Sequence, residues 1–251
     1  AGMGDLRSLL SRELAVAPDT LRFTEHHVEH HIAHIASAFY CSGWKEAAGF
    51  SYDGSGDFVT AMRARCRDRE IEPLSRVFVP HSLGSFYTMI CDFIGYRQYG
   101  DEGKVMGLAP YGTDKYVPQI REMVGYANGE LRLNLDYYEP FGSNQGMRIT
   151  EDGTVVLSRH FSGNMIELFG PPREPHAEIT QRDMDLAFAM QMRFEELLFA
   201  MLRDLHDQTR LDDLVMAGDS YRQRQKPKVT GKEATVEAAP RRRPHGKRGR
   251  R

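Results

Sequence analysis

The stretch His26-His27-Val28-Glu29-His30-His31-Ile32-Ala33-His34-Ile35-Ala36-Ser37-Ala38-Phe39-Tyr40 decides how the rest of the chain is interpreted. It holds five of the ten histidines within nine positions. At helical spacing, His26, His30 and His34 share one face, and a separate apolar stripe can bury the helix. Two histidines four residues apart can bind one cation, because their side chains start about 5–6 Å apart. The alternative is a polar, histidine-rich surface.

A glycine-rich segment with two carboxylates, Asp53-Gly54-Ser55-Gly56-Asp57, begins 19 residues after His34. It follows the strand-like run 47–52, so the carboxylates are expected at a strand end. A carboxylate close to a histidine pair favours a metal site. The alternative is an ordinary turn in which both carboxylates accept backbone N–H groups. A calcium loop is not expected, because the glutamate that such a loop requires does not follow.

Composition indicates an acidic domain with a basic tail. The chain has 251 residues, 41% hydrophobic, which is enough for a sizeable core. Residues 219–251 carry 12 of the 33 Lys+Arg and 3 of the 35 Asp+Glu, so their net charge is +9 and that of residues 1–218 is −11. We expect the tail to be disordered and to bind nucleic acid only non-specifically, through its charge.

Location is predicted from what the sequence lacks. The three cysteines are widely spaced, and the first residues have no signal-peptide profile. No apolar run approaches the roughly 20 residues that a membrane span needs. We therefore expect a cytoplasmic protein that does not insert into a membrane.

Hydrophobic periodicity predicts an alternation of helices and strands, and hence an α/β fold. A strand over residues 21–25 is expected to lead into the histidine helix, which Gly43 ends. A hairpin of strands 46–52 and 58–65 follows. The other predicted helices are 6–14, 83–94, 114–123 and 180–206, and the other predicted strands are 75–79, 131–138, 154–157 and 214–218.

A further helix is predicted to start at Asp101-Glu102-Gly103-Lys104, with Asp101 as its N-cap. Free N–H groups and a lysine at a helix N-terminus suit an anion such as phosphate. Glu102, Gly103 and Lys104 are therefore candidate cofactor-binding residues, and the alternative is a solvated lysine. The GxxxxGK[ST] spacing of a Walker A loop is absent.

Four blocks occur in a fixed order: residues 30–40, the DGSGD segment, Ser82-Leu83-Gly84-Ser85-Phe86-Tyr87, and Glu102-Gly103-Lys104-Val105-Met106-Gly107-Leu108-Ala109-Pro110-Tyr111-Gly112. Together they resemble the carbamoyltransferases of nodulation-factor and antibiotic biosynthesis. The resemblance covers roughly residues 20–218. It implies the actin/sugar-kinase-like (ribonuclease H-like) fold that this family shares with the threonylcarbamoyl transferases of tRNA.

The resemblance also implies an activity and a metal site. Such enzymes transfer a carbamoyl group to a hydroxyl of a sugar or another small molecule, such as an antibiotic. ATP and carbamoyl phosphate give carbamoyl-adenylate in a YrdC-like C-terminal domain, and the amino-terminal domain, with bound iron, passes the carbamoyl group on. By resemblance, the ligands of this divalent metal are His30, His34 and Asp53, with His31 as a neighbour. The sequence does not single out a general base.

Departures from the family pattern qualify this expectation. Gly218 is followed by Asp219-Ser220-Tyr221-Arg222, not by a second glycine and an Asn-containing loop, and no YrdC-like domain is recognisable. We expect residues 1–218 to be a partial carbamoyltransferase amino-terminal domain, incomplete at both ends and inactive alone. A reading-frame change near Gly218 would explain the tail. The alternatives are a non-catalytic metal-binding remnant and a tRNA-modifying relative.

Overall fold

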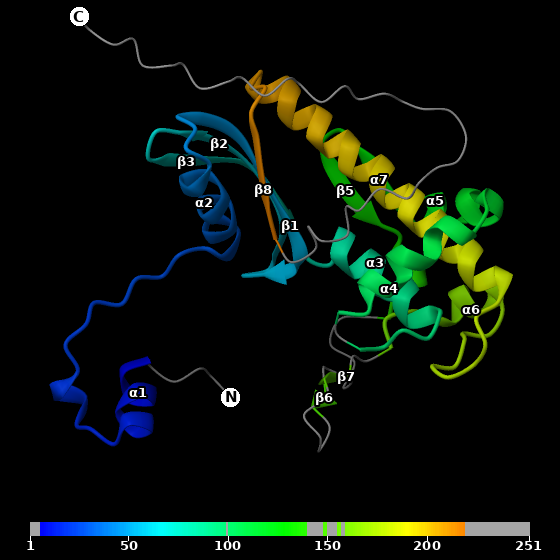
Figure 1. Cartoon of the computed structure of the whole chain (residues 1–251), viewed down its shortest axis with the longest axis horizontal. Helices are drawn as coiled ribbons and strands as arrows, with labels where there is room; N and C mark the ends of the chain where they lie inside the picture. Colours follow the sequence, from blue (N-terminus) through cyan, green and yellow to red (C-terminus); the bar gives the residue numbers. More distant parts are fainter. Residues whose placement is uncertain (1–5, 99, 140–147, 150–154, 157–158, 219–251) are drawn as a thin grey trace, which may run out of the picture.

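A four-stranded mixed sheet of order β3-β2-β1-β8 forms the centre of the fold (Figure 1). Strands β1 (Glu46–Gly56), β2 (Val59–Arg67) and β3 (Glu70–Phe78) form an antiparallel meander, and β8 (Leu214–Ala217) pairs in parallel with β1. This computed structural model describes residues 6–98, 100–139, 148–149, 155–156 and 159–218. The predicted α/β class is confirmed.

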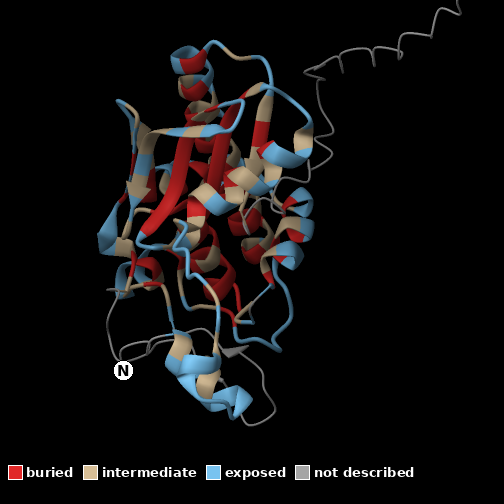
Figure 2. Ribbon diagram, turned by 90° about the vertical axis from the view of Figure 1, so that its left-hand side faces the viewer, coloured by how far each residue is buried: buried red, intermediate tan, exposed pale blue. Residues whose placement is uncertain are grey.

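Helices cover both faces of the sheet. Helix α2 (His30–Ser42) lies on one face, and α3 (Leu83–Phe93) and α7 (Gln181–Thr209) lie on the other (Figure 1). Strands β1 and β2 are largely buried, and Figure 2 shows buried strands in the middle of the fold, whereas the edge strand β3 has no buried residue.

Side chains of β1 alternate between the two layers, as the pleat of a strand requires. Ala47 belongs to the apolar cluster beneath α2, whereas Phe50 and Tyr52 belong to the larger cluster beneath α3 and α7. The alternation turns Ser51 and Asp53 toward α2. The candidate carboxylate ligand therefore faces the helix that carries the histidines.

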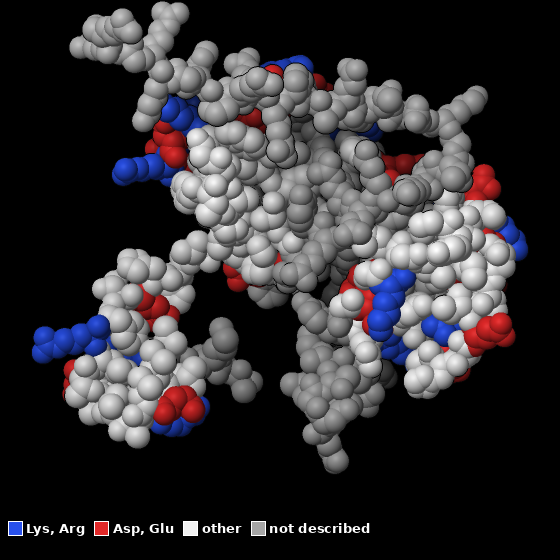
Figure 3. Space-filling view, in the orientation of Figure 1, with Lys and Arg blue, Asp and Glu red and all other residues white. Residues whose placement is uncertain are grey.

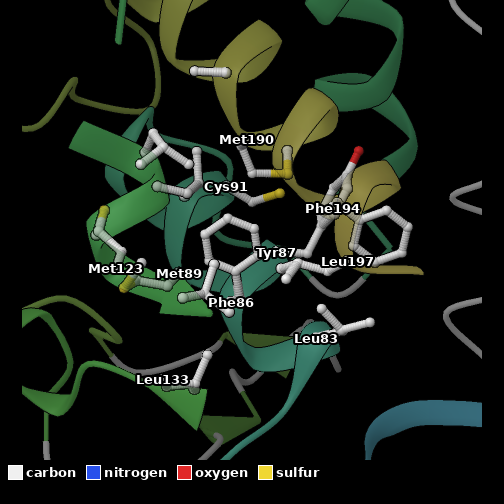
Figure 4. Close-up of a cluster of buried hydrophobic side chains, with 14 of the residues drawn as sticks. Leu83, Phe86, Tyr87, Met89, Cys91, Met123, Leu133, Met190, Phe194 and Leu197 are labelled. Carbon is white, nitrogen blue, oxygen red and sulfur yellow. The ribbon is translucent and has the colours of Figure 1, made fainter. Parts of the chain in front are cut away.

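The larger core joins α3 to α7 (Figure 4). The rings of Tyr87 and Phe194 meet edge to face, with centroids 5.5 Å apart, and both side chains are fully buried. The Thr180 hydroxyl and the Asp183 carboxylate form a capping box that starts α7. This core holds the helical layer of α3 and α7 against the sheet, and its buried methionines are packing residues.

The remaining elements surround this framework. They are the helices α1 (Leu6–Leu14), α4 (Glu102–Leu108), α5 (Val117–Met123) and α6 (Gly163–Phe169), the 3-10 turns Pro18–Thr20, Ala109–Tyr111, Asp114–Tyr116 and Leu135–Tyr137, and the strands β4 (Val124–Ala127), β5 (Glu130–Leu133), β6 (Arg148–Ile149) and β7 (Val155–Val156). None of the helices in the described ranges combines the length and apolar composition of a bilayer-spanning segment.

Charged side chains of both signs are interspersed over the described part of the face in Figure 3. Many charged side chains of the described residues form local pairs, such as Arg193–Glu196 at 2.9 Å and Arg132–Glu130 at 2.6 Å. Such pairs cancel one another's field at a distance. The described part of this face therefore offers little single-signed charge.

Three predicted elements differ from the observed ones. Residues 21–25 are extended but form no strand; the Arg7 guanidinium instead donates to the carbonyls of Leu21 and Phe23. Helix α2 begins at His30, so His26 lies outside it and does not share a helical face with His30. The predicted strand 131–138 ends at Leu133 and gives way to a 3-10 turn.

The helix predicted over residues 6–14 is found with those ends, and the other predicted elements are found with shifted ends. Gly43 ends α2 in the left-handed conformation, with φ +76°. Strand β3 starts five residues before its predicted start at Ser75, and Pro73 is tolerated there because β3 is an edge strand in the described sheet. Strand β7 falls within the predicted run 154–157, whose end residues lie outside the described residues. The predicted disorder of residues 219–251 also concerns residues outside the described part of the chain.

Candidate metal centre

The first candidate ligand, His30, is also the first residue of α2. Its backbone N–H donates to the Asp57 carboxylate at 2.8 Å. The N-cap residue Glu29 makes no side-chain cap; its carboxylate instead accepts from the Arg76 guanidinium at 2.7 and 2.8 Å, which lowers the pKa of Glu29. A carboxylate from the β1–β2 hairpin thus fixes the end of the helix at which the histidine pair begins.

Asp53 brings the hairpin and the histidine pair together. Its Oδ1 accepts from the backbone N–H of Gly54 at 2.8 Å, and its Oδ2 lies 3.1 Å from Nε2 of His30 and 3.3 Å from Nε2 of His34. The two Nε2 atoms are 3.0 Å apart. The ordinary turn and the metal site, expected as alternatives, therefore occur together at Asp53. One carboxylate oxygen accepts a backbone N–H, and the other faces two imidazoles. The Asp57 carboxylate, by contrast, holds the start of the helix.

The chemistry of this donor set fits a metal ion. One atom from each of His30, His34 and Asp53 lies within 4.8 Å of the others. Two ligand atoms that each lie about 2.1 Å from an ion, with a ligand–ion–ligand angle of about 90°, are about 3.0 Å apart. The observed separations are close to this value. Two imidazoles and one carboxylate with further positions open suit a borderline divalent ion such as iron(II) or zinc(II).

The candidate centre is partly open to solvent. The side chain of His30 is 38% exposed, that of His34 24% and that of Asp53 10%. The Asp53 carboxylate is thus shielded, while the histidine side leaves access for an additional oxygen ligand. These three residues were predicted as a set, and the structure places them together.

His31 occupies a different environment, although it lies next to His30 in the sequence. It is fully buried, its Nδ1 lies 2.6 Å from the Ser51 hydroxyl and its Nε2 lies 2.9 Å from the carbonyl oxygen of Val59. Burial lowers the pKa of His31 and favours the neutral imidazole. Both ring nitrogens point away from the candidate metal position and toward the hairpin.

The block that begins at Ser82 supports the carboxylate segment. The buried Ser82 hydroxyl lies 2.8 Å from the carbonyl oxygen of Gly54 and 3.0 Å from that of Asp53. A Cβ on Gly84 would lie 2.7 Å from the backbone nitrogen of Gly54, so only glycine allows α3 to approach this closely. Sequence reasoning identified the block but not this contact, because the two segments are 28 residues apart.

The candidate phosphate-binding residues lie at the start of α4, apart from the histidine pair. Lys104 forms an ion pair with Asp101 at 2.6 Å, and this pair raises the pKa of Lys104. Asp101 is the N-cap residue, as predicted, but its carboxylate accepts from Lys104 and from the Gln98 N–H and makes no cap to the helix. Within the described residues, no hydrogen bond or ion pair joins Glu102, Gly103 or Lys104 to the three candidate metal ligands.

Comparison with known proteins places this site in a family. The sequence profile described as "Carbamoyltransferase N-terminus" matches residues 13–221, which include the sheet, α2 and the candidate metal centre. The chain belongs to the carbamoyltransferase N-terminal domain family.

Individual relatives agree with this assignment. Nodulation protein NolNO of Sinorhizobium fredii is 31% identical over 217 residues, which cover 85% of this chain and 28% of that protein. Nodulation protein NolO of Bradyrhizobium diazoefficiens is 30% identical over 195 residues, covering 76% and 31%. An uncharacterised protein of Synechocystis is 33% identical over 193 residues, covering 76% and 29%. The chain therefore spans about three tenths of the length of these relatives.

Proposed function

We propose that this chain is the metal-binding part of an O-carbamoyltransferase, which transfers a carbamoyl group from carbamoyl-adenylate to a hydroxyl of a sugar or antibiotic-type small molecule. The observation that carries the proposal is the convergence of His30, His34 and Asp53 within a domain that matches the family profile. Two relatives bear the names of nodulation proteins, which favours the small-molecule branch over a tRNA-modifying enzyme.

The three side chains have separate roles in this proposal. The neutral imidazoles of His30 and His34 would supply two nitrogen ligands and the Asp53 carboxylate an oxygen ligand to a divalent ion, with iron favoured by the resemblance. When bound, the ion would offset the negative charge of nucleotide oxygens. The Gly54 N–H and the Ser82 hydroxyl hold the Asp53 segment, so the carboxylate need not reorganise when an ion binds.

The proposal also includes a binding site for the nucleotide and a source for the carbamoyl group. Lys104 would exchange its pair with Asp101 for a phosphate of ATP or carbamoyl-adenylate, with Glu102 and Gly103 beside it. Carbamoyl phosphate would be the source of the carbamoyl group, and a YrdC-like domain would make the adenylate. Positioning and charge stabilisation would then supply most of the catalysis.

The fold proposal is the actin/sugar-kinase-like, or ribonuclease H-like, arrangement. Its support is the three-stranded antiparallel meander followed, after a helical connection, by a strand that pairs in parallel with β1. Helices cover both faces of this sheet, as is usual in α/β folds.

A transfer assay with the donor made in trans tests the function. The chain would be mixed with a separately expressed YrdC-like domain, ATP, carbamoyl phosphate, ferrous iron and a panel of aminoglycoside, cephem and oligosaccharide acceptors. We expect mass spectrometry to detect a carbamoylated product with the wild-type chain, but not with His34→Ala and not without the YrdC-like domain. Product that is equal with wild type and His34→Ala would contradict the proposed role of the centre.

A further inference from the structure

His31 lies next to His30 in the sequence of α2, and its side chain connects that helix to both strands of the β1–β2 hairpin. A carbonyl oxygen only accepts hydrogen bonds, so the Nε2 atom that faces Val59 carries the proton. The Nδ1 atom is then an acceptor, and the Ser51 hydroxyl donates to it at 2.6 Å. One fully buried side chain therefore makes two hydrogen bonds of defined direction.

The two ends of this connection lie next to the candidate ligands. Ser51 precedes Asp53 by two residues and projects from the same face of β1. Val59 begins β2 directly after the turn whose Asp57 carboxylate holds the His30 N–H. Because α2 is a rigid helix, fixing His31 against the hairpin also fixes the ligand pair against Asp53.

Apolar contacts also join α2 to β1, and they set how closely the two elements approach. Glycine occupies β1 at two points of close approach: a Cβ on Gly49 would lie 2.8 Å from Ile35, and one on Gly56 would lie 2.2 Å from the His30 ring. Only glycine on β1 allows the helix to approach this closely at these two points. Apolar packing is also non-directional, whereas a hydrogen bond weakens steeply when it is bent.

We propose that His31 is a positioning residue for the metal centre, and that its bonds to Ser51 and Val59 set the separation between the histidine pair and the Asp53 carboxylate. This inference rests on the proposed function of the centre. An apolar side chain of similar size would fill the same space, but it would leave the Ser51 hydroxyl and the Val59 carbonyl without this partner. It would also remove two of the contacts that fix the rotation of α2, and would leave the Asp57 bond to His30 and the apolar packing in place.

The test compares metal binding with stability in the full chain. The variants are His31→Phe and the milder Ser51→Ala, and the control is Phe39→Leu, which alters another buried side chain of α2 away from the hydrogen bonds. Cobalt(II) serves as the probe, because its visible absorption reports the coordination geometry. Thermal unfolding without metal measures the structural cost of each change.

We expect His31→Phe to weaken cobalt affinity by about tenfold and to alter the absorption bands, as changes to the groups that support metal ligands do. Ser51→Ala should show a smaller change in the same direction. Phe39→Leu should keep the cobalt affinity and the absorption bands of wild type, even if its unfolding temperature falls as much as that of His31→Phe. If His31→Phe does not fold, Ser51→Ala decides by the same comparison.

Unchanged cobalt binding in the His31 and Ser51 variants would overturn the positioning role, and so would an equal loss in Phe39→Leu at matched stability. Neither result would contradict the metal centre itself, because the wild-type chain binds cobalt in both cases. Absence of cobalt binding by the wild-type chain would instead overturn the metal centre, and the positioning role with it.

Discussion

The Asp57 carboxylate accepts the backbone N–H of His30 at 2.8 Å, although the two residues are 27 positions apart. This bond sets the first turn of α2, and therefore the place where the histidine pair begins. The turn that presents Asp57 is tight: Asp57 and Phe58 both have positive φ, at 52° and 64°. Such two-residue turns normally contain asparagine or glycine. Phe58 is also 79% exposed, so burial does not offset the backbone cost at this residue.

Arg63 should be the most sensitive arginine of β2. It is 4% exposed and donates to the Ser75 hydroxyl at 2.7 Å, the Tyr126 hydroxyl at 2.9 Å and the Gly129 carbonyl at 3.0 Å. Arg63→Met should lower the free energy of unfolding by about 3 kcal/mol, because it removes all three hydrogen bonds from partly buried partners. Urea denaturation measures the loss.

The matched control is Arg65→Met on the same strand. Arg65 forms a 3.9 Å pair with Glu72, and its side chain is 34% exposed. A change within about 0.5 kcal/mol is expected for such a pair. Equal losses in the two variants would show that the buried network around Arg63 contributes nothing specific.

The raised pKa of Tyr126 predicts that the folded chain loses stability at alkaline pH. Burial, and after it the hydrogen bond to Asp204, raises the pKa of Tyr126 to about 12, above the ordinary value of about 10. A raised pKa favours the protonated form in the folded state. The resulting stability is present below about pH 10 and is lost as the pH rises toward about 12.

The comparison that isolates this effect is Tyr126→Phe against wild type at about pH 8 and about pH 11. At the lower pH, wild type should be more stable than Tyr126→Phe. The difference in unfolding free energy between the two proteins should be smaller at the higher pH. The Cys66 thiol, whose pKa burial raises to about 11, is present in both proteins and cancels. A difference that stays constant with pH would contradict the assignment to Tyr126.

Lys104 is predicted to bind a nucleotide phosphate. Lys104→Ala should weaken ATP binding by about tenfold, the effect of losing one charge-assisted hydrogen bond. Lys115→Ala is the control, since Lys115 lies over the Tyr116 ring and belongs to a different turn. Isothermal titration gives both affinities, and an equal effect of the two substitutions would remove Lys104 from the nucleotide site.

The basic tail makes a separate prediction. Any binding of DNA should weaken steeply with salt, because it depends on phosphate neutralisation by lysine and arginine. It should disappear when residues 219–251, with a net charge of +9, are deleted. Electrophoretic mobility shifts at several salt concentrations measure both effects. Binding that survives the deletion would place the nucleic-acid surface on residues 1–218.

Local sequence patterns predicted much of this site. The four-residue spacing of His30 and His34, the glycine that ends α2 and the strands on either side of the DGSGD segment are all determined by neighbours in the chain. The pattern also predicted carboxylates at the end of a strand, but the choice of Asp53 over Asp57 as the ligand came from the family resemblance. Periodicity therefore predicted the elements that carry the site, and the resemblance predicted which of their residues converge.

Long-range contacts determine what the sequence did not predict. The periodicity of the histidine stretch continues back to His26, but the helix starts at His30 because Asp57 caps it there. Residues 21–25 have strand-like composition but pair with no strand, and Arg7 holds them instead. The hydrogen bonds of His31 likewise depend on how α2 lies across the hairpin, which no local pattern encodes.

Metal content of the purified chain tests the central claim most directly. Wild type, His30→Ala, His34→Ala and Asp53→Asn would be reconstituted with ferrous iron under anaerobic conditions, desalted and measured by elemental analysis. His27→Ala is the matched control, because His27 lies in the same histidine-rich stretch but pairs with Glu25 at 3.2 Å and is not among the three converging ligands. The account predicts bound iron in wild type and His27→Ala and a sharp loss in the other three variants. Equal iron content in all five proteins, or an equal loss in His27→Ala, would contradict it.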